Sequence, residues 1–489
     1  MSQPPFPPEM PEGQQPSEPP VHLVEPPRHR FSPAVTAVMA AMLIVGIGFF
    51  AWLQVTIPPL ERVAIPEVAL PWVVGRTLDA EEATARASPW ERFFYQVTSE
   101  THADELNQAI RWYRELADAT QNAQVHLELA ILEAEHGEVE EVRRRIGSWR
   151  VLDAPFPLFA DMVQAAYITP PVDRAEARTL LAKVAEILPA GWFYDRIAMR
   201  LAAKAGDEPL LESIDRGRSE RIMPLLEKIR ILTVVESTTV ALGLLAVVRI
   251  VRGGSRISTA PIPPPWRGRL GMIVLIRGGA MAVVLTVAAL FLDGDDPFIR
   301  LWTVPLASLP VFAMAHRHLL QPHGHGFITG LGLRPFPGAW PRTVLAVLAV
   351  LAVGLSGEWI IGLVADWFDV VSHWTEWFDA DLVWGGPDTL FVTLMEFVVI
   401  APAVEEMMFR GLLFGTLRRR FGLVAAGVIS AGLFAVAHGY GMVGFASVFL
   451  SGLLWAWIYE RTGSLVPGML AHALNNLLVC ASTITLLRP

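Results

Sequence analysis

The stretch Val404-Glu405-Glu406-Met407-Met408-Phe409-Arg410-Gly411 places three charged residues inside an apolar run long enough to cross a bilayer. Charged side chains at membrane depth are costly and usually mark a functional site. On a helix, Glu406 and Arg410 are four residues apart and can pair, whereas Glu405 points about 100° away. The stretch therefore predicts a membrane helix with a structural ion pair and an unpaired carboxylate that suits a general base. The alternative is an ion cluster that only fixes helix packing.

The composition excludes an ordinary soluble protein. The 489 residues are 53% hydrophobic and only 18% charged, and apolar runs of 18 or more residues recur through the C-terminal half. A single cysteine, Cys480, excludes an intrachain disulfide framework and a CxxC metal site. No basic stripe or glycine-rich phosphate loop is present, so we expect no nucleic-acid partner. These features predict an all-α, multi-pass protein of the cell membrane, in contact with lipid.

The sequence divides into four segments. Residues 1–30 hold ten prolines and predict a disordered cytoplasmic tail, and residues 31–59 predict the first transmembrane helix. Residues 60–229 are rich in Ala, Glu, Leu and Arg with helical spacing, which predicts a helical domain similar to paired tetratricopeptide-like helices, although the 34-residue signature is not clear. Residues 230–489 predict the multi-span domain.

Charge asymmetry predicts the orientation. Arg28 and Arg30 precede the first span and place the N-terminus in the cytoplasm, so the helical domain lies on the outer side. About nine spans fit the apolar runs, with the cationic loops inside. The acidic segment 366–388 carries four tryptophans, which suits an amphipathic segment at the membrane interface, namely Trp367, Trp374, Trp377 and Trp384.

Polar residues occur in three of the last four predicted spans. Besides the opening stretch, these are His438 and the pair His472 and Asn476, which are four residues apart on one helical face. At about 1.5 Å of rise per residue, Glu405, His438 and His472 all fall within the membrane. The three spans are therefore expected to bring these side chains together, in a site that opens toward the cytoplasmic half of the bilayer.

The three motifs resemble those of the CPBP family of intramembrane proteases, which includes the type II CAAX prenyl endopeptidases and bacteriocin-processing or immunity proteins. They are Glu405-Glu406-xxx-Arg410, Phe434-xxx-His438 and His472-xxx-Asn476, in the order and spacing of that family. The resemblance covers roughly residues 388–480. It implies a membrane protease whose substrate is a membrane-associated peptide or protein, with a prenylated CAAX-type substrate expected from one branch of the family.

The resemblance also implies a role for each residue. Glu405 and His438 would polarise the attacking water, His472 and Asn476 would bind the oxyanion, and Glu406 with Arg410 would hold the helix. No cofactor is favoured, although Glu405, His438 and His472 would be the ligands of a zinc site with an open water position.

Two further expectations concern function. The alternative to an endopeptidase is a non-catalytic membrane-binding or immunity-type protein with the same fold. The helical domain, which lies outside the family resemblance, is expected to bind a protein partner or the substrate, and not to supply catalytic residues.

Overall fold

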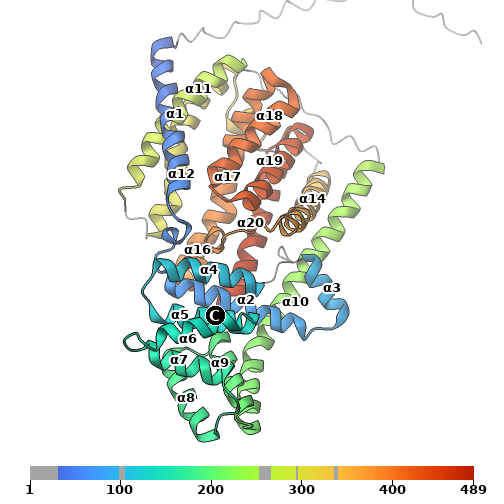
Figure 1. Ribbon diagram of the computed structural model, residues 1–489. Helices are drawn as coiled ribbons and strands as arrows, with labels where there is room; N and C mark the ends of the chain where they lie inside the picture. Colours follow the sequence, from blue (N-terminus) through green and yellow to red (C-terminus); the bar gives the residue numbers. More distant parts are fainter. Residues whose placement is uncertain (1–30, 99–104, 253–265, 293–295, 335–339) are drawn as a thin grey trace, which may run out of the picture.

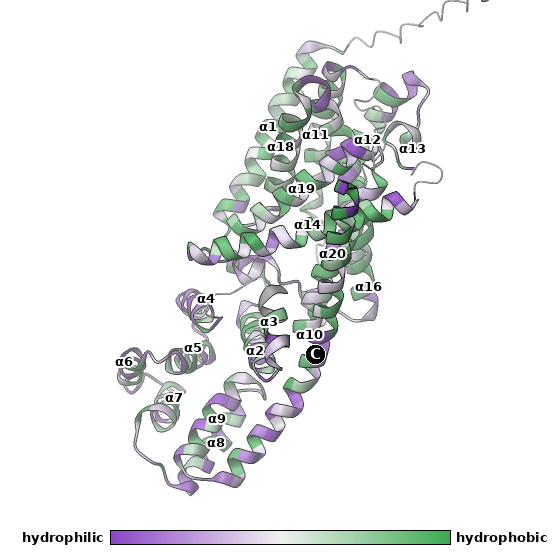
Figure 2. Cartoon of the chain, turned by 90° about the vertical axis from the view of Figure 1, so that its right-hand side faces the viewer, coloured by the Kyte–Doolittle hydropathy of each residue, from purple (hydrophilic) through white to green (hydrophobic). Residues whose placement is uncertain are grey.

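The computed structural model describes residues 31–98, 105–252, 266–292, 296–334 and 340–489. These residues form helices and no strand, as the all-α prediction requires. The predicted disordered tail, residues 1–30, lies outside the described residues. Helices of apolar composition form a bundle, and helices with many hydrophilic residues form a domain at one end of it (Figures 1 and 2).

The helical domain packs its helices around a main core and two smaller clusters. Helix boundaries follow local sequence signals: Asn122 accepts a hydrogen bond from Gln124 N at the start of one helix, and Gly137 ends it in the left-handed conformation at φ 91°. The helices are α2 (Pro66–Ala85), α3 (Pro89–Thr98), α4 (Glu105–Ala119), α5 (Ala123–His136), α6 (Val139–Trp149), α7 (Phe156–Val163), π-helix η2 (Gln164–Ile168), α8 (Arg174–Ile187) and α9 (Trp192–Lys204). A one-turn helix, η1 (Pro59–Arg62), links the domain to the first span.

Within the described residues, eight helical segments are long and apolar enough to cross a membrane. The first three are α1 (Pro33–Thr56), α10 (Glu208–Arg252) and α11 (Gly268–Ala289). The fourth joins α12 (Pro297–Ala315) to π-helix η3 (His316–Leu320) and the turn η4 (Gln321–His323), and the short α13 (Phe327–Gly330) follows it. The last four are α14 (Trp340–Trp367), the segment Pro387–His438, α19 (Met442–Thr462) and α20 (Val466–Leu487).

The segment Pro387–His438 folds back on itself. Gly422, at φ 79° and ψ −178°, interrupts α18 (Gly415–His438), and this positive φ favours glycine. Ser430 Oγ then donates to Phe409 O at 2.9 Å, so the two arms lie side by side. This segment therefore contains both the sixth and the seventh of the nine predicted spans.

No linker separates the helical domain from the second span. The helix α10 runs for 45 residues, from the domain into the bundle, and the predicted boundary at 229–230 lies inside it (Figure 1). The side of α10 that faces away from the bundle becomes apolar at Ile231, which is 66% exposed. A continuous helix fixes the position of the domain relative to the spans.

The segment between α14 and α16 (Pro387–Met395) packs into the helical domain. It contains the turn η5 (Trp374–Glu376) and the short helix α15 (Ala380–Trp384). Trp374 is fully buried and belongs to the main core of the helical domain, together with Val383 and Leu487. The prediction that all four tryptophans lie at the membrane interface is therefore wrong for Trp374, because the helical domain buries that side chain.

Polar contacts also join the two parts. Trp72 Nε1 donates to Leu487 O at 2.7 Å, and Arg76 Nε donates to Leu486 O at 2.8 Å. Arg111 pairs with Asp369 at 3.0 Å. The helical domain thus holds both the end of α20 and the segment that precedes α16.

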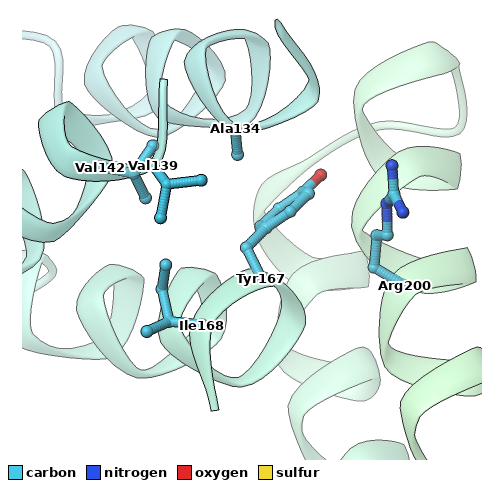
Figure 3. A pocket seen from close by; sticks show the side chains of 6 residues that line it. All are labelled: Ala134, Val139, Val142, Tyr167, Ile168 and Arg200. Atoms are coloured by element: carbon cyan, nitrogen blue, oxygen red, sulfur yellow. The ribbon is translucent and has the colours of Figure 1, made fainter. Parts of the chain in front are cut away.

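A pocket of about 180 Å³ lies within the helical domain (Figure 3). Its lining residues come from α5, α6, η2 and α9, and they are Ala134, Val139, Val142, Tyr167, Ile168 and Arg200. The guanidinium of Arg200 binds Glu135 through two hydrogen bonds of 2.9 Å, so its charge is already neutralised. The pocket is separate from the intramembrane polar residues.

The orientation gives a testable prediction. Single cysteines in a Cys480→Ala background are expected to react with a membrane-impermeant maleimide from the outer side at Arg150→Cys and Asp369→Cys. Arg419→Cys is expected to react only from the cytoplasmic side, because Gly422 places it at the opposite end of the bundle. Labelling of positions 150 and 369 from opposite sides would contradict the packing, and labelling of both from the cytoplasm would contradict the predicted orientation.

Candidate active site

The helix with the acidic pair is widened in two places. The π-helices η6 (Glu396–Ile400) and η7 (Glu406–Phe414) flank one turn of α-helix, α17 (Ala401–Glu405). In a π-helix each N–H bonds to a carbonyl five residues earlier, and such turns are frequent at functional sites. Glu405 ends the α-helical turn and Glu406 begins the π-helix, so the backbone changes form between the two carboxylates.

Glu406 and Arg410 form the predicted ion pair. Arg410 Nη1 donates to Glu406 Oε1 at 2.8 Å, and both side chains are almost completely buried. The guanidinium lies over the rings of Phe434 and Trp455, at 4.1 and 4.9 Å from their centroids. Buried charges need such partners, because the membrane interior does not solvate them.

His472 joins this ion pair to Glu405. Its Nδ1 lies 3.2 Å from Glu406 Oε1, and its Nε2 lies 3.7 Å from Glu405 Oε2. The ring is buried and stacks on Trp455 with centroids 3.9 Å apart. Glu405 keeps 23% of its side chain exposed, whereas Glu406 keeps 1%. The two adjacent carboxylates therefore differ as predicted: one is enclosed with a cation, and the other is accessible.

His438 lies next to this group through a shared aromatic ring. The Phe434 ring is 4.6 Å from the ring of His438 and 5.9 Å from that of His472. Nδ1 of His438 lies 2.8 Å from Phe434 O. Because a carbonyl oxygen only accepts, Nδ1 carries the proton and Nε2 is left as a base.

Asn476 lies one turn beyond His472 on α20 and has a structural partner. Its Nδ2 donates to Phe397 O at 2.9 Å. In η6 the N–H of Ala401 bonds to Glu396 O, and the next donor in that pattern would be Pro402, which has no N–H. Asn476 therefore satisfies the carbonyl that Pro402 leaves without a donor. The second N–H of the amide remains available.

The structure does not bring the alternative zinc ligands together as a metal site. Within the described residues, no three His, Cys, Asp or Glu side chains lie close enough to bind one metal ion. Nδ1 of His472 is directed to Glu406 and Nδ1 of His438 to a carbonyl, an orientation that metal-binding histidines commonly have, with Nε2 left for the metal. The zinc alternative, with Glu405, His438 and His472 as the residues that would hold the ion, therefore stays a prediction.

His438 lies near the helical domain, whereas His472 lies in the second turn of α20, and it is the opposite end of that helix, Leu487, that contacts the helical domain. His438 is the last residue of α18, and the following Gly439 O accepts a hydrogen bond of 3.4 Å from Arg62, which lies between α1 and the helical domain. Glu376 packs closely against Gly441, since a Cβ atom added at Gly441 would lie only 2.8 Å from Glu376 Oε1. The site residues therefore lie at different depths of the bundle, and the expectation that the site opens toward the cytoplasmic half stays a prediction.

One family model matches a part of the chain. Residues 387–478 match the family model described as type II CAAX prenyl endopeptidase Rce1-like. These residues form a CPBP-family domain. The matched range includes all six predicted site residues and begins at the first residue of α16. No curated protein and no solved structure matches the chain.

The match supports a peptidase at the level of the family, with a membrane setting and peptide substrates. The helical domain and the first five predicted spans lie outside the matched range. The CPBP domain therefore accounts for the polar cluster, and the role of the helical domain remains a prediction.

Three further residues of the CPBP domain were missed by sequence reasoning. Trp455 stacks on His472, and the Arg410 guanidinium lies over its ring. Ser430 Oγ donates a hydrogen bond to Phe409 O in η7. Tyr440 follows His438, with ring centroids 5.6 Å apart. Partial burial and the carboxylates of Glu405 and Glu376 raise the pKa of Tyr440, so its hydroxyl stays protonated. In the sequence, Trp455 and Tyr440 are marked only as aromatic residues in or beside the predicted spans that carry the polar motifs.

Proposed function

We propose that the protein is an intramembrane endopeptidase in which Glu405 and His438 activate water. The observation that carries this proposal is the difference between the two adjacent carboxylates. Glu406 is enclosed with Arg410 and His472, whereas Glu405 is partly exposed and has His472 Nε2 at 3.7 Å. An accessible carboxylate held beside a fixed polar cluster is suited to general-base catalysis.

In the proposed reaction the oxygen of one water attacks the carbonyl carbon of the scissile peptide bond. Glu405 and Nε2 of His438 polarise that water and take its proton, and the proton then moves to the leaving amide nitrogen as the C–N bond breaks. The Nδ1–H bond to Phe434 O supports this role, because it holds the ring with Nε2 unprotonated.

The oxyanion is proposed to bind His472 and Asn476. Donation to the oxyanion requires a proton on Nε2 of His472, whose Nδ1 faces the Glu406 carboxylate. Asn476 would contribute its second N–H.

The proposed substrate is a membrane-associated peptide. A prenylated CAAX-type peptide is the first candidate, since the matched family model describes prenyl endopeptidases. We propose that the helical domain binds a protein partner or the substrate. Its contacts with Trp374 and Asp369 support such a role, because they reach the segment beside the site.

The test is cleavage of membrane-anchored peptides, with and without a prenyl group, by the purified protein in liposomes. His438→Gln is expected to reduce cleavage by about 10²–10⁴-fold, because it removes a proton acceptor. His323→Gln is the matched control: Nδ1 of His323 also lies 2.9 Å from the carbonyl four residues earlier, but in the turn η4. Folded wild-type protein that cleaves no peptide would favour the non-catalytic alternative, and equal loss in both variants would contradict the role of His438.

A further inference from the structure

The helix α3 (Pro89–Thr98) carries an exposed aromatic face. Trp90, Phe93 and Phe94 are 66%, 61% and 42% exposed. Their spacing places them on one face of the helix, and their rings contact one another, with centroids 6.2 Å apart for Trp90–Phe94 and 5.7 Å apart for Phe93–Phe94. Three exposed aromatic residues in one patch usually mark an interaction surface.

The opposite face of α3 is fixed to α10. Tyr95 is buried against Ile222 and Leu226 of α10 in a small core that also includes Ala83 and Ala87. Because one face is anchored in this way, the aromatic face keeps a defined direction relative to the bundle. Figure 1 shows α3 beside α10, at the end of the helical domain that is nearest to the spans.

The ion pair between Glu91 and Arg230 fixes the position of α3 along the length of α10. Arg230 Nε donates to Glu91 Oε1 at 2.9 Å. The next residue of α10, Ile231, is 66% exposed, and Val234 is 64% exposed, so the lipid-facing surface of the span begins there. The helix α3 therefore lies where α10 enters the bilayer.

We propose that α3 lies in the bilayer interface, with Trp90, Phe93 and Phe94 inserted among the lipids of the leaflet on the helical-domain side. Tryptophan is enriched at membrane interfaces, and an amphipathic helix with an aromatic face binds in the plane of the interface. The exposed apolar residues of α10 begin at Ile231, directly after the Arg230 that binds Glu91 of α3, which favours lipid over a protein partner. This contact would hold the helical domain against the membrane beside the site.

The test uses the full chain with Cys480→Ala, one introduced cysteine and an environment-sensitive fluorophore, in phosphatidylcholine liposomes with shallow nitroxide-labelled lipid. A probe at Phe93→Cys is expected to be quenched several-fold more than one at Val151→Cys. Val151 is the control because it is apolar, 85% exposed and in the helical domain after α6. A probe at Trp90→Cys repeats the measurement in case Phe93→Cys fails to fold.

Two outcomes would overturn the proposal. If the nitroxide-labelled lipid quenches the probes at positions 93 and 151 equally, and aqueous iodide also quenches them equally, the aromatic face lies in water. Blue-shifted emission at position 93 without quenching by the lipid would place it against protein, such as a second copy of the chain.

Discussion

Glu405→Gln is expected to reduce peptide cleavage by about 10²–10⁴-fold while the protein still folds and inserts. The amide has nearly the size of the carboxylate but accepts no proton. The side chain is partly exposed and its contact with His472 is 3.7 Å long, so the change leaves no buried charge without a partner. Cleavage rate per folded molecule is the quantity to measure, with thermal unfolding in detergent as the check on folding.

Glu460→Gln provides the matched control for Glu405→Gln. It makes the same chemical change in the CPBP domain, at a partly exposed ion pair with Arg418. Arg418 donates to both carboxylate oxygens of Glu460, so the change is expected to lower the unfolding temperature, whereas cleavage per folded molecule should stay near wild type. A folded Glu405→Gln protein that cleaves as fast as Glu460→Gln would contradict the proposed general base.

The second large effect is expected on stability. Arg410→Met leaves the buried Glu406 carboxylate without its cation, and Glu406→Gln leaves the Arg410 guanidinium without its anion. Breaking a buried ion pair from one side costs about 3–5 kcal/mol. Each single variant should therefore unfold at a lower temperature, accumulate less in membranes and cleave less.

The double variant Glu406→Gln and Arg410→Met distinguishes the loss of stability caused by an unpaired buried charge from the loss caused by altered packing. It removes both buried charges, so it should unfold closer to wild type than either single variant does. Single variants that melt like wild type would contradict the structural pair. A double variant whose loss equals the sum of the two single losses would show that the two side chains do not depend on each other.

Local spacing in the sequence was enough to predict part of the site. The distance of four residues places Glu406 and Arg410 on one helical face, and the structure pairs them although the backbone there is a π-helix. The apolar runs likewise predicted the membrane segments, since their length is set by the bilayer. Both predictions depend only on short-range geometry.

Contacts between distant segments could not be predicted in this way. The stacking of His472 on Trp455 and the bond from Asn476 to Phe397 O depend on how three helices pack. Trp374 has the sequence context of an interfacial tryptophan, yet a domain far away in the chain buries it. The side toward which the site opens likewise depends on long-range packing, and it stays a prediction.

The most direct test of the account is peptide cleavage in water enriched in ¹⁸O, followed by mass spectrometry of both fragments. Wild-type protein in liposomes is expected to add one heavy oxygen to the new carboxylate of the N-terminal fragment and none to the C-terminal fragment. Glu405→Gln should give neither fragment above background. Fragments without heavy oxygen, or labelled fragments at the wild-type rate from folded Glu405→Gln, would contradict an endopeptidase in which Glu405 activates water.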